Sequence, residues 1–285
     1  MRYINKLAPF SLFEKYNILK LSIGSRLINN VPKGLKYAYL LINRLLKLDI
    51  KVERITESIR FKYLVNYIEI SFNLKRNSSD SQVFEQIIEK EEFLPIVEIF
   101  KEKNITPLSM IDAGANIGLT SLYFKSYFPD LLITAIEPSD DTFCRLETNI
   151  ASNKFSGITL IKKGLWSSKT RLKADRSFRD GQDWSFKLIE ASTNDEALFD
   201  TITIEEIMID NNLLTIDFLK IDIEGGEVDL FKDFSQIKWL EKVKVIALEI
   251  HDEFNCRQYI ESNLEKLFTL TYSGELTIGI NKNIL

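Results

Sequence analysis

Cysteine is scarce in this chain of 285 residues, and long apolar runs are absent. Cys144 and Cys256 lack the paired spacing of a metal or redox motif, so we expect no disulfide framework and a reducing, cytoplasmic compartment. No stretch reaches the roughly 18 uninterrupted apolar residues of a membrane span. The first ten residues, MRYINKLAPF, also lack the apolar run of a signal peptide. A hydrophobic fraction of 45% is typical of a globular protein of one or two domains.

Positive charge is concentrated near the N-terminus. The net charge of −4 argues against a nucleic-acid-binding protein. Residues 1–76, however, contain 15 Lys and Arg against 5 Asp and Glu, a net +10, whereas the remainder contains 22 against 36, a net −14. A polar run over residues 76–80 separates the two regions. We therefore expect a basic N-terminal extension over residues 1–76 and a main domain over residues 77–285.

The main domain alternates short apolar runs with amphipathic, helix-like segments. The apolar runs that we expect to be strands are 108–113, 131–136, 158–161, 216–221 and 243–250. Helix-like segments follow the first two of these runs. This alternation predicts an α/β fold, in which a parallel sheet has helices on both faces. The last two predicted strands, 268–272 and 275–280, flank Ser273-Gly274 and predict an antiparallel hairpin at the edge of that sheet.

The extension is predicted to hold a helix and a β-hairpin. Apolar residues nearly alternate from Arg60 to Leu74, which is typical of a hairpin. Residues 33–51 are expected to be a helix with a wide apolar face. Its basic side chains share an arc of roughly 80°: Lys33, Lys36, Arg44, Lys47 and Lys51. Such a helix can contact the inner face of a membrane, or it can pack its apolar face on the main domain.

A glycine-containing loop follows the first strand of the main domain. Gly114 permits a tight turn and a close backbone approach, and Gly118 lets the next helix pack closely with its amides toward a ligand. The spacing G-x-N-x-G differs from the G-x-G-x-x-G of dinucleotide-binding folds. Asn116 places a side chain where a pyrophosphate would need bare backbone. The loop therefore favours a ligand with an amino-acid end.

An acidic residue ends the next strand. Glu137 lies 23 residues beyond Gly114, where a carboxylate can accept both hydroxyls of a ribose, and Pro138 fixes the turn. Asp112 and Glu137 could each merely cap a helix. Their order on consecutive strands nevertheless predicts one nucleotide-binding site, made of Asp112, Gly114, Asn116, Gly118, Glu137 and Pro138.

Three blocks carry a resemblance to a known family. Residues 112–118 resemble its cofactor loop and residues 135–138 its ribose-binding strand. Residues 217–227 contain its pattern Lys-x-Asp-x-Glu-Gly-x-Glu, with Lys220, Asp222, Glu224, Gly225 and Glu227. The chain thus resembles the FkbM methyltransferases over about residues 80–280. The resemblance implies a class I, Rossmann-like sheet, S-adenosylmethionine as cofactor, and O-methylation of a sugar, polysaccharide or other small molecule.

The third block and the single histidine supply candidate catalytic residues. Methyl transfer to a hydroxyl needs a base, and clustered carboxylates beyond the ends of parallel strands can raise one another's pKa. Asp222, Glu224 and His251 are therefore the predicted catalytic residues. Glu227 is interpreted as the start of a helix, with Lys220 as partner of the glutamates. Oxygen ligands alone do not specify a metal, so no metal site is predicted.

A polar insertion separates the third and fourth predicted strands, from Trp166 to Asn194. Its basic and aromatic side chains could overhang an acceptor site and suit a carbohydrate or an anion, or could simply face solvent. They are Lys169, Arg171, Lys173, Arg176, Arg179, Trp184 and Phe186.

The same motifs disfavour two other functions. Amino-methylating enzymes of nucleic acids commonly carry an Asn/Asp-Pro-Pro-aromatic motif, where this chain has residues 222–225 without proline. The glycine spacing disfavours an NAD-dependent oxidoreductase. A non-catalytic module that binds S-adenosylmethionine and a methyltransferase acting on a macromolecule remain open. The expected partner is a small-molecule or glycan acceptor, not nucleic acid, and the oligomeric state is left open.

Overall fold

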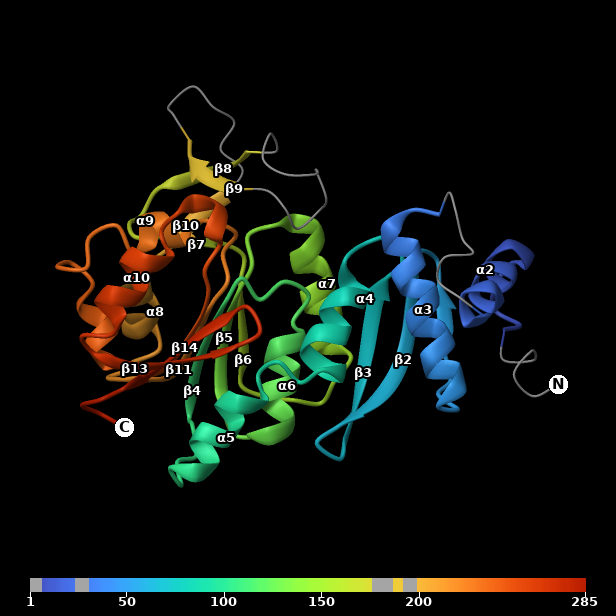
Figure 1. The fold of residues 1–285 in the computed structure, drawn as a ribbon, viewed down its shortest axis with the longest axis horizontal. Helices are drawn as coiled ribbons and strands as arrows, with labels where there is room; N and C mark the ends of the chain where they lie inside the picture. Colours follow the sequence, from blue (N-terminus) through green and yellow to red (C-terminus); the bar gives the residue numbers. More distant parts are fainter. Residues whose placement is uncertain (1–6, 24–30, 176–186, 192–198) are drawn as a thin grey trace.

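A seven-stranded sheet lies at the centre of the computed structural model, which describes residues 7–23, 31–175, 187–191 and 199–285 (Figure 1). Its strand order is β13-β14-β12-β11-β4-β5-β6. The strands are β4 (Ser109–Ala113), β5 (Leu132–Ile136), β6 (Ile158–Ile161), β11 (Ile216–Ile221), β12 (Val243–Glu249), β13 (Phe268–Ser273) and β14 (Leu276–Asn281). Strands β12, β11, β4, β5 and β6 pair in parallel, whereas β14 pairs antiparallel with both β12 and β13. The predicted α/β fold with a C-terminal antiparallel hairpin is confirmed.

Helices cover both faces of this sheet. One face packs against α5 (Leu94–Glu102), α6 (Leu119–Tyr127) and α7 (Asp140–Ala151). The other face packs against α8 (Ile204–Asp210), α9 (Glu227–Leu230) and α10 (Arg257–Leu264). Successive side chains of a strand point to opposite faces, so Met110 and Ile111 of β4 enter different hydrophobic clusters. Burial on both faces explains why these strands are apolar runs instead of alternating patterns.

The order of the strands creates a crevice beside β4. From β4 the chain proceeds to β5 and β6 on one side, then returns to form β11 and β12 on the other side. The loops that leave the carboxyl ends of β4 and β11 therefore diverge, which is where open α/β sheets bind ligands.

The N-terminal elements form a second, smaller unit beside α7 (Figure 1). They are α2 (Leu12–Ile23), α3 (Lys33–Lys47), β1 (Glu53–Ile55), β2 (Ser58–Val65) and β3 (Ile68–Lys75). The predicted hairpin is confirmed as β2 and β3, and β1 adds a third antiparallel strand. The backbone N–H of Asn73 donates to Asn149 of α7 at 2.7 Å. Apolar side chains of this unit share one hydrophobic cluster with α5, α6 and α7.

The apolar face of α3 could contact a membrane or pack on the main domain, and the structure shows that it packs on the protein. Tyr39, Ile42 and Leu45 are buried in the shared cluster, so this face packs on the protein. The helix ends at Lys47 instead of near residue 51, because the chain turns at Asp49, which has a φ of +66°. The side chain of Arg44 pairs with Glu85 and Glu89, the first and last residues of the π-helical turn Glu85–Glu89 that follows α4 (Asp80–Phe84).

The insertion after β6 contributes a four-stranded sheet. It is made of β7 (Gly164–Leu165), β10 (Phe199–Ile202), β8 (Arg171–Asp175) and β9 (Lys187–Glu190), in that spatial order. Trp166 is buried, and its indole N–H donates to Glu190 at 3.1 Å, so it anchors this sheet. Arg176, Arg179, Trp184 and Phe186 lie outside the described residues. Two short 3-10 helices, Lys238–Lys242 and Asp252–Phe254, lie before and after β12.

Candidate functional site

The loop after β4 is closed down onto the loop after β11. Gly114 has a φ of +73°, and its N–H donates to the Ile136 carbonyl at 3.0 Å. A Cβ at Gly114 would lie 1.7 Å from the carbonyl oxygen of Asp222. The sequence predicted a close approach of a ligand to the backbone of this glycine, but the group that the structure places against it is another one. That group is the backbone of the second loop.

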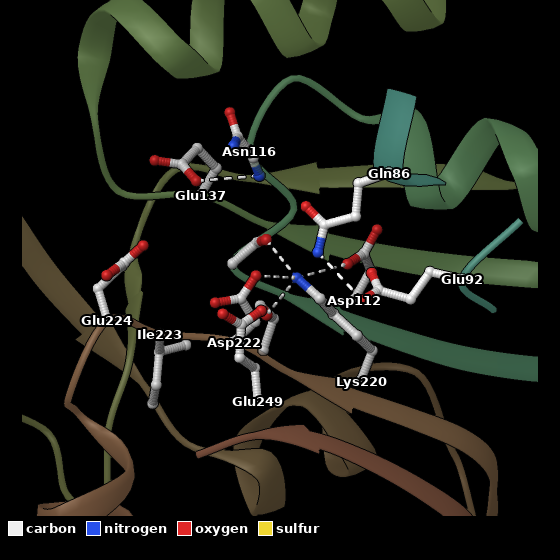
Figure 2. A network of polar contacts seen from close by, with 12 residues as sticks. Gln86, Glu92, Asp112, Asn116, Glu137, Lys220, Asp222, Ile223, Glu224 and Glu249 are labelled. Atoms are coloured by element: carbon white, nitrogen blue, oxygen red, sulfur yellow. Dashed lines mark hydrogen bonds and ion pairs between the residues drawn. The ribbon is translucent and has the colours of Figure 1, made fainter. Parts of the chain in front are cut away.

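Glu137 faces a groove beside this loop. Its Oε2 accepts from the backbone N–H of Asn116 at 3.1 Å (Figure 2). Its Oε1 accepts from the backbone N–H of Ser139 at 3.0 Å. Each oxygen has a second lone pair, so the carboxylate can still accept hydroxyl hydrogens. Burial raises the pKa of Glu137 to about 7. The groove is also lined by Gly114, Pro138 and, from α7, Thr142 and Arg145.

Asp112 and Gly118 do not line this groove. Asp112 is fully buried, where its Oδ2 accepts from the Ser121 hydroxyl at 2.7 Å and its burial raises the pKa. Gly118 has a φ of +85°, and a Cβ there would lie 2.6 Å from Leu146. The sequence suggested close packing of Gly118 against the sheet. In the structure it packs closely against α7 instead. The structure places both residues behind the loop, as its support.

Lys220 is the central residue of the polar network in Figure 2. Its Nζ donates to the Gly114 carbonyl at 2.6 Å and to Asp222 at 3.1 Å, and it lies 3.8 Å from Asp112. Burial alone would lower the pKa of Lys220, but the charges of Asp222 and Asp112 raise it. The expectation that Lys220 pairs with Glu224 and Glu227 is wrong. Because β11 lies next to β4, this side chain extends beneath the glycine loop instead.

A second pocket lies on the other side of that loop and is acidic. The loop after β11 contributes Asp222 and Glu224, and the end of β12 contributes Glu249 and His251. Gly114, Asn116, Asp222 and Glu224 line both the groove and this pocket. The two cavities therefore meet at the carboxylates of Asp222 and Glu224.

His251 is buried and held between carboxylates. Its Nδ1 lies 3.4 Å from Glu227, and its Nε2 lies 3.4 Å from Glu224. Glu227 begins α9 as expected, and its other oxygen accepts from the Ile223 N–H at 3.0 Å. Burial lowers the pKa of His251, but Glu227 and Glu224 raise it above its usual value. The structure thus brings the three predicted catalytic residues together.

The pKa of Glu249 is raised by the neighbouring carboxylates of the acidic pocket. Repulsion by Asp222, together with burial, raises the pKa of Glu249. Glu92 lies in the same pocket, and burial raises the pKa of its carboxyl as well. Carboxyl groups with a raised pKa keep their protons to higher pH than usual, so the pocket can exchange protons with a bound molecule.

Several lining residues were missed by sequence reasoning as members of the site. Thr142 and Arg145 lie early in the helix that follows Glu137-Pro138, and this proximity in the chain was a usable signal. Glu92, which precedes α5, belongs to a weaker part of the family resemblance in the sequence, as does Glu249. Glu275 has no such signal, because it lies in the β13–β14 turn and only the tertiary fold brings it to the pocket.

The sequence of this chain is similar to those of known methyltransferases. The family described as "Methyltransferase FkbM domain" matches residues 112–270, a range that includes Asp112 and His251. "Methyltransferase sdnD" of Sordaria araneosa is 29% identical over 192 residues, 57% of this chain and 74% of that protein. "Hexuronic acid methyltransferase AglP" of Haloferax volcanii is 28% identical over 141 residues, 49% of this chain and 54% of that protein.

A solved structure shares the fold. The METTL16 MTase domain superimposes with a TM-score of 0.51 and 10% identity, covering 98% of this chain and 92% of that one. The central sheet is thus that of a class I, Rossmann-like methyltransferase.

Proposed function

This chain belongs to the FkbM methyltransferase family, and on that premise we propose that it transfers a methyl group from S-adenosylmethionine to a hydroxyl oxygen of a sugar or another small molecule. The observation that carries the proposal is the wall shared by the two cavities, which contains Gly114, Asn116, Asp222 and Glu224. A donor in the groove and an acceptor in the acidic pocket would meet at this wall, as a direct displacement requires.

The residues of the groove suit the proposed cofactor. Glu137 would accept the two ribose hydroxyls, and Gly114 and Asn116 would face the amino-acid end. Pro138 and Thr142 extend the same groove for the base. S-adenosylmethionine supplies the methyl group from a sulfonium, and the electron pair of the broken C–S bond stays on sulfur.

The acidic pocket suits a polyhydroxylated acceptor. Its carboxylates can accept hydrogen bonds from several hydroxyls, and Asp222, Glu224 and His251 lie closest to the shared wall. As the acceptor oxygen forms its bond to the methyl carbon, its proton passes to this cluster. The relative AglP, named for a hexuronic acid, supports a sugar as the class of acceptor.

Calorimetric titration with S-adenosylmethionine tests the cofactor assignment. Loss of a charged acceptor of two hydrogen bonds should weaken binding by about 1.5–3 kcal/mol, or about tenfold or more. We therefore expect that change in Glu137→Ala. Glu147→Ala removes an exposed carboxylate from α7, the helix that follows Glu137, and this variant should bind the cofactor normally. An unchanged dissociation constant in Glu137→Ala would refute the assignment.

Transfer of a labelled methyl group tests the reaction and the acceptor. The protein is incubated with methyl-labelled cofactor and either hydroxylated sugars or a cell extract. Label in a small hydroxylated product supports the proposal. Label in a macromolecule would show that the acceptor is a macromolecule and not a small molecule. Cofactor binding without transfer to any acceptor would favour a non-catalytic module.

A further inference from the structure

Three side chains beside the shared wall are placed like the ligands of one metal ion. Asp222, Glu224 and His251 each offer one donor atom, and these three atoms lie within 4.8 Å of one another. The Nε2 of His251 is 3.4 Å from Oε2 of Glu224. Two ligand atoms at about 2.1 Å from one metal ion lie about 3.0–3.4 Å apart at octahedral or tetrahedral angles. The distance between His251 and Glu224 therefore fits two ligands of one cation, and Asp222 offers a carboxylate oxygen within 4.8 Å of both atoms.

The histidine ring is held from behind by a buried carboxylate. Glu227 is fully buried, and its Oε2 lies 3.4 Å from Nδ1 of His251. The other oxygen of Glu227 accepts from the backbone of Ile223, so this carboxylate is itself fixed. Metal-binding histidines commonly have such a partner on the ring nitrogen that faces away from the metal, because it fixes the ring and its tautomer. With Nδ1 so occupied, Nε2 is the nitrogen presented to Glu224.

Acidic side chains outnumber basic ones in the lining of the pocket around His251. Among the described residues that line it, Glu92, Asp222, Glu224, Glu249 and Glu275 are acidic, against Lys220 and His251. Lys220 is already engaged by the glycine loop and by Asp222. The carboxylate oxygens of Asp222 and Glu224 are donor atoms of the kind that divalent ions bind.

We propose that Asp222, Glu224 and His251 bind one divalent metal ion at the junction of the groove and the acidic pocket. One imidazole and two carboxylates form a mixed donor set that suits an ion such as Mn²⁺. The role of the ion rests on the proposed function: it would bind the acceptor oxygen and make its hydroxyl a stronger acid, and the released proton would pass to Glu249 of the same pocket. Metal binding itself needs neither cofactor nor acceptor, so it is measured separately.

The test is Mn²⁺ binding to the full-length chain after dialysis against a chelator. The free-Mn²⁺ electron paramagnetic resonance signal is followed during titration, without S-adenosylmethionine. We expect one ion per chain, with affinity at least about tenfold weaker in His251→Ala and in Glu224→Gln. Asp229→Asn is the matched control, because this carboxylate lies on α9 but does not line the pocket. Its affinity should equal that of the unmodified chain.

Glu227→Gln separates metal binding from folding. This change keeps the size of the side chain but removes the charge behind His251, and loss of such a partner weakens metal binding by about 10–100-fold. Circular dichroism and thermal melting must show that each variant is folded. Failure of the unmodified chain to retain Mn²⁺, or full affinity in His251→Ala, would overturn the site.

The outcomes also separate this proposal from the proposed function. Methyl transfer that persists in excess chelator, together with no Mn²⁺ binding, overturns the metal site alone. Mn²⁺ binding that is sensitive to His251→Ala supports the metal site even if no S-adenosylmethionine is bound, and that second result refutes only the proposed function.

Discussion

Lys220 joins the two halves of the site at the scale of single residues. Its ammonium contacts the carbonyl of Gly114 on one loop and the carboxylate of Asp222 on the other. Nearly complete burial of Lys220 makes both contacts strong, because little water screens them. The loop that would hold the donor and the carboxylate that would face the acceptor are therefore fixed relative to each other.

The ionisation of Glu137 should make cofactor binding depend on pH. Burial raises the pKa of this carboxyl to about 7, so its ionised fraction rises from about one tenth at pH 6 to about nine tenths at pH 8. The ionised form accepts both ribose hydroxyls, so affinity should increase by about tenfold over that range. Calorimetry at pH 6, 7 and 8 measures it. The slope should be absent in Glu137→Gln, and an equal slope there would assign it to another group.

Asp222 is expected to act on turnover more than on cofactor binding. Its carboxylate lines both cavities, and in Asp222→Asn the amide keeps the shape of the side chain but cannot take a proton. We expect kcat to fall about 100-fold or more, with the dissociation constant of the cofactor nearly unchanged. His251→Ala should give the smaller loss of kcat. If kcat and cofactor affinity of Asp222→Asn fell equally, Asp222 would be a support of the loop.

At the scale of elements, the loops after β4 and β11 touch with no room for a side chain at Gly114. The carbonyl of Asp222 occupies the place of a Cβ, as described above. This contact sets how closely the two strands can present their carboxyl ends. Any residue larger than glycine must therefore separate the loops.

Gly114→Ala should thus destabilise the fold far more than its backbone angle explains. We expect a loss of roughly 3 kcal/mol or more in the free energy of unfolding, measured with urea. Gly157→Ala is the matched control, since Gly157 has a φ of +74° but its nearest neighbour is the side chain of Leu132 at 2.9 Å. It should lose only about 1–2 kcal/mol. Equal losses would show that the collision with Asp222 relaxes freely.

Elements of the main sheet were predictable because their burial leaves a plain mark in the sequence. Runs such as 216–221 are apolar throughout, since β11 is buried on every side. Strand β1 was missed because Glu53–Ile55 is mostly exposed and has no apolar pattern. Helix α4 continues as a π-helical turn at Glu85–Glu89, which the helical spacing of its apolar residues did not indicate. The pairing of Lys220 was missed for another reason: the strand order, and not local spacing, selects its partners.

At the scale of the whole molecule, the basic extension is tied to the acidic main domain by ion pairs. Arg44 contacts Glu89 at 2.7 Å, and Lys75 contacts Asp141 of α7 at 3.2 Å. Arg76 is buried against Glu14 of α2, within the extension. Part of the opposite charge of the two regions is therefore used to hold them together. Within the described residues, no helix is long and apolar enough to cross a membrane.

The exposed apolar side chains of the extension include a group on α2, besides Leu48 at the end of α3 and Leu64 and Tyr67 on the hairpin. Leu12, Phe13, Tyr16 and Leu19 lie along one face of α2, and their exposed fractions are 85%, 64%, 57% and 36%. Lys20 lies 5.0 Å from the Tyr16 ring centroid, which adds a cation at the edge of this face. Exposed apolar side chains within a segment of net positive charge are typical of a helix that lies in the interface of an anionic membrane. The sequence assigned a peripheral membrane contact to the helix over residues 33–51; because the apolar face of α3 is buried, we expect such a contact from α2 instead.

Co-sedimentation with phosphatidylcholine vesicles that contain phosphatidylglycerol tests this membrane contact. The full-length chain should bind these vesicles and bind less as salt is added, because the attraction to the headgroups is screened. Leu12→Ser with Phe13→Ser should abolish binding. Ile209→Ser with Leu214→Ser, at 73% and 87% exposure outside the extension, should leave it intact. These substitutions are preferable to removing residues 1–52, since that deletion would also strip the buried face of α3 from the core. Binding that is absent in the full-length chain, or lost equally in both double variants, would show that α2 does not contact the membrane.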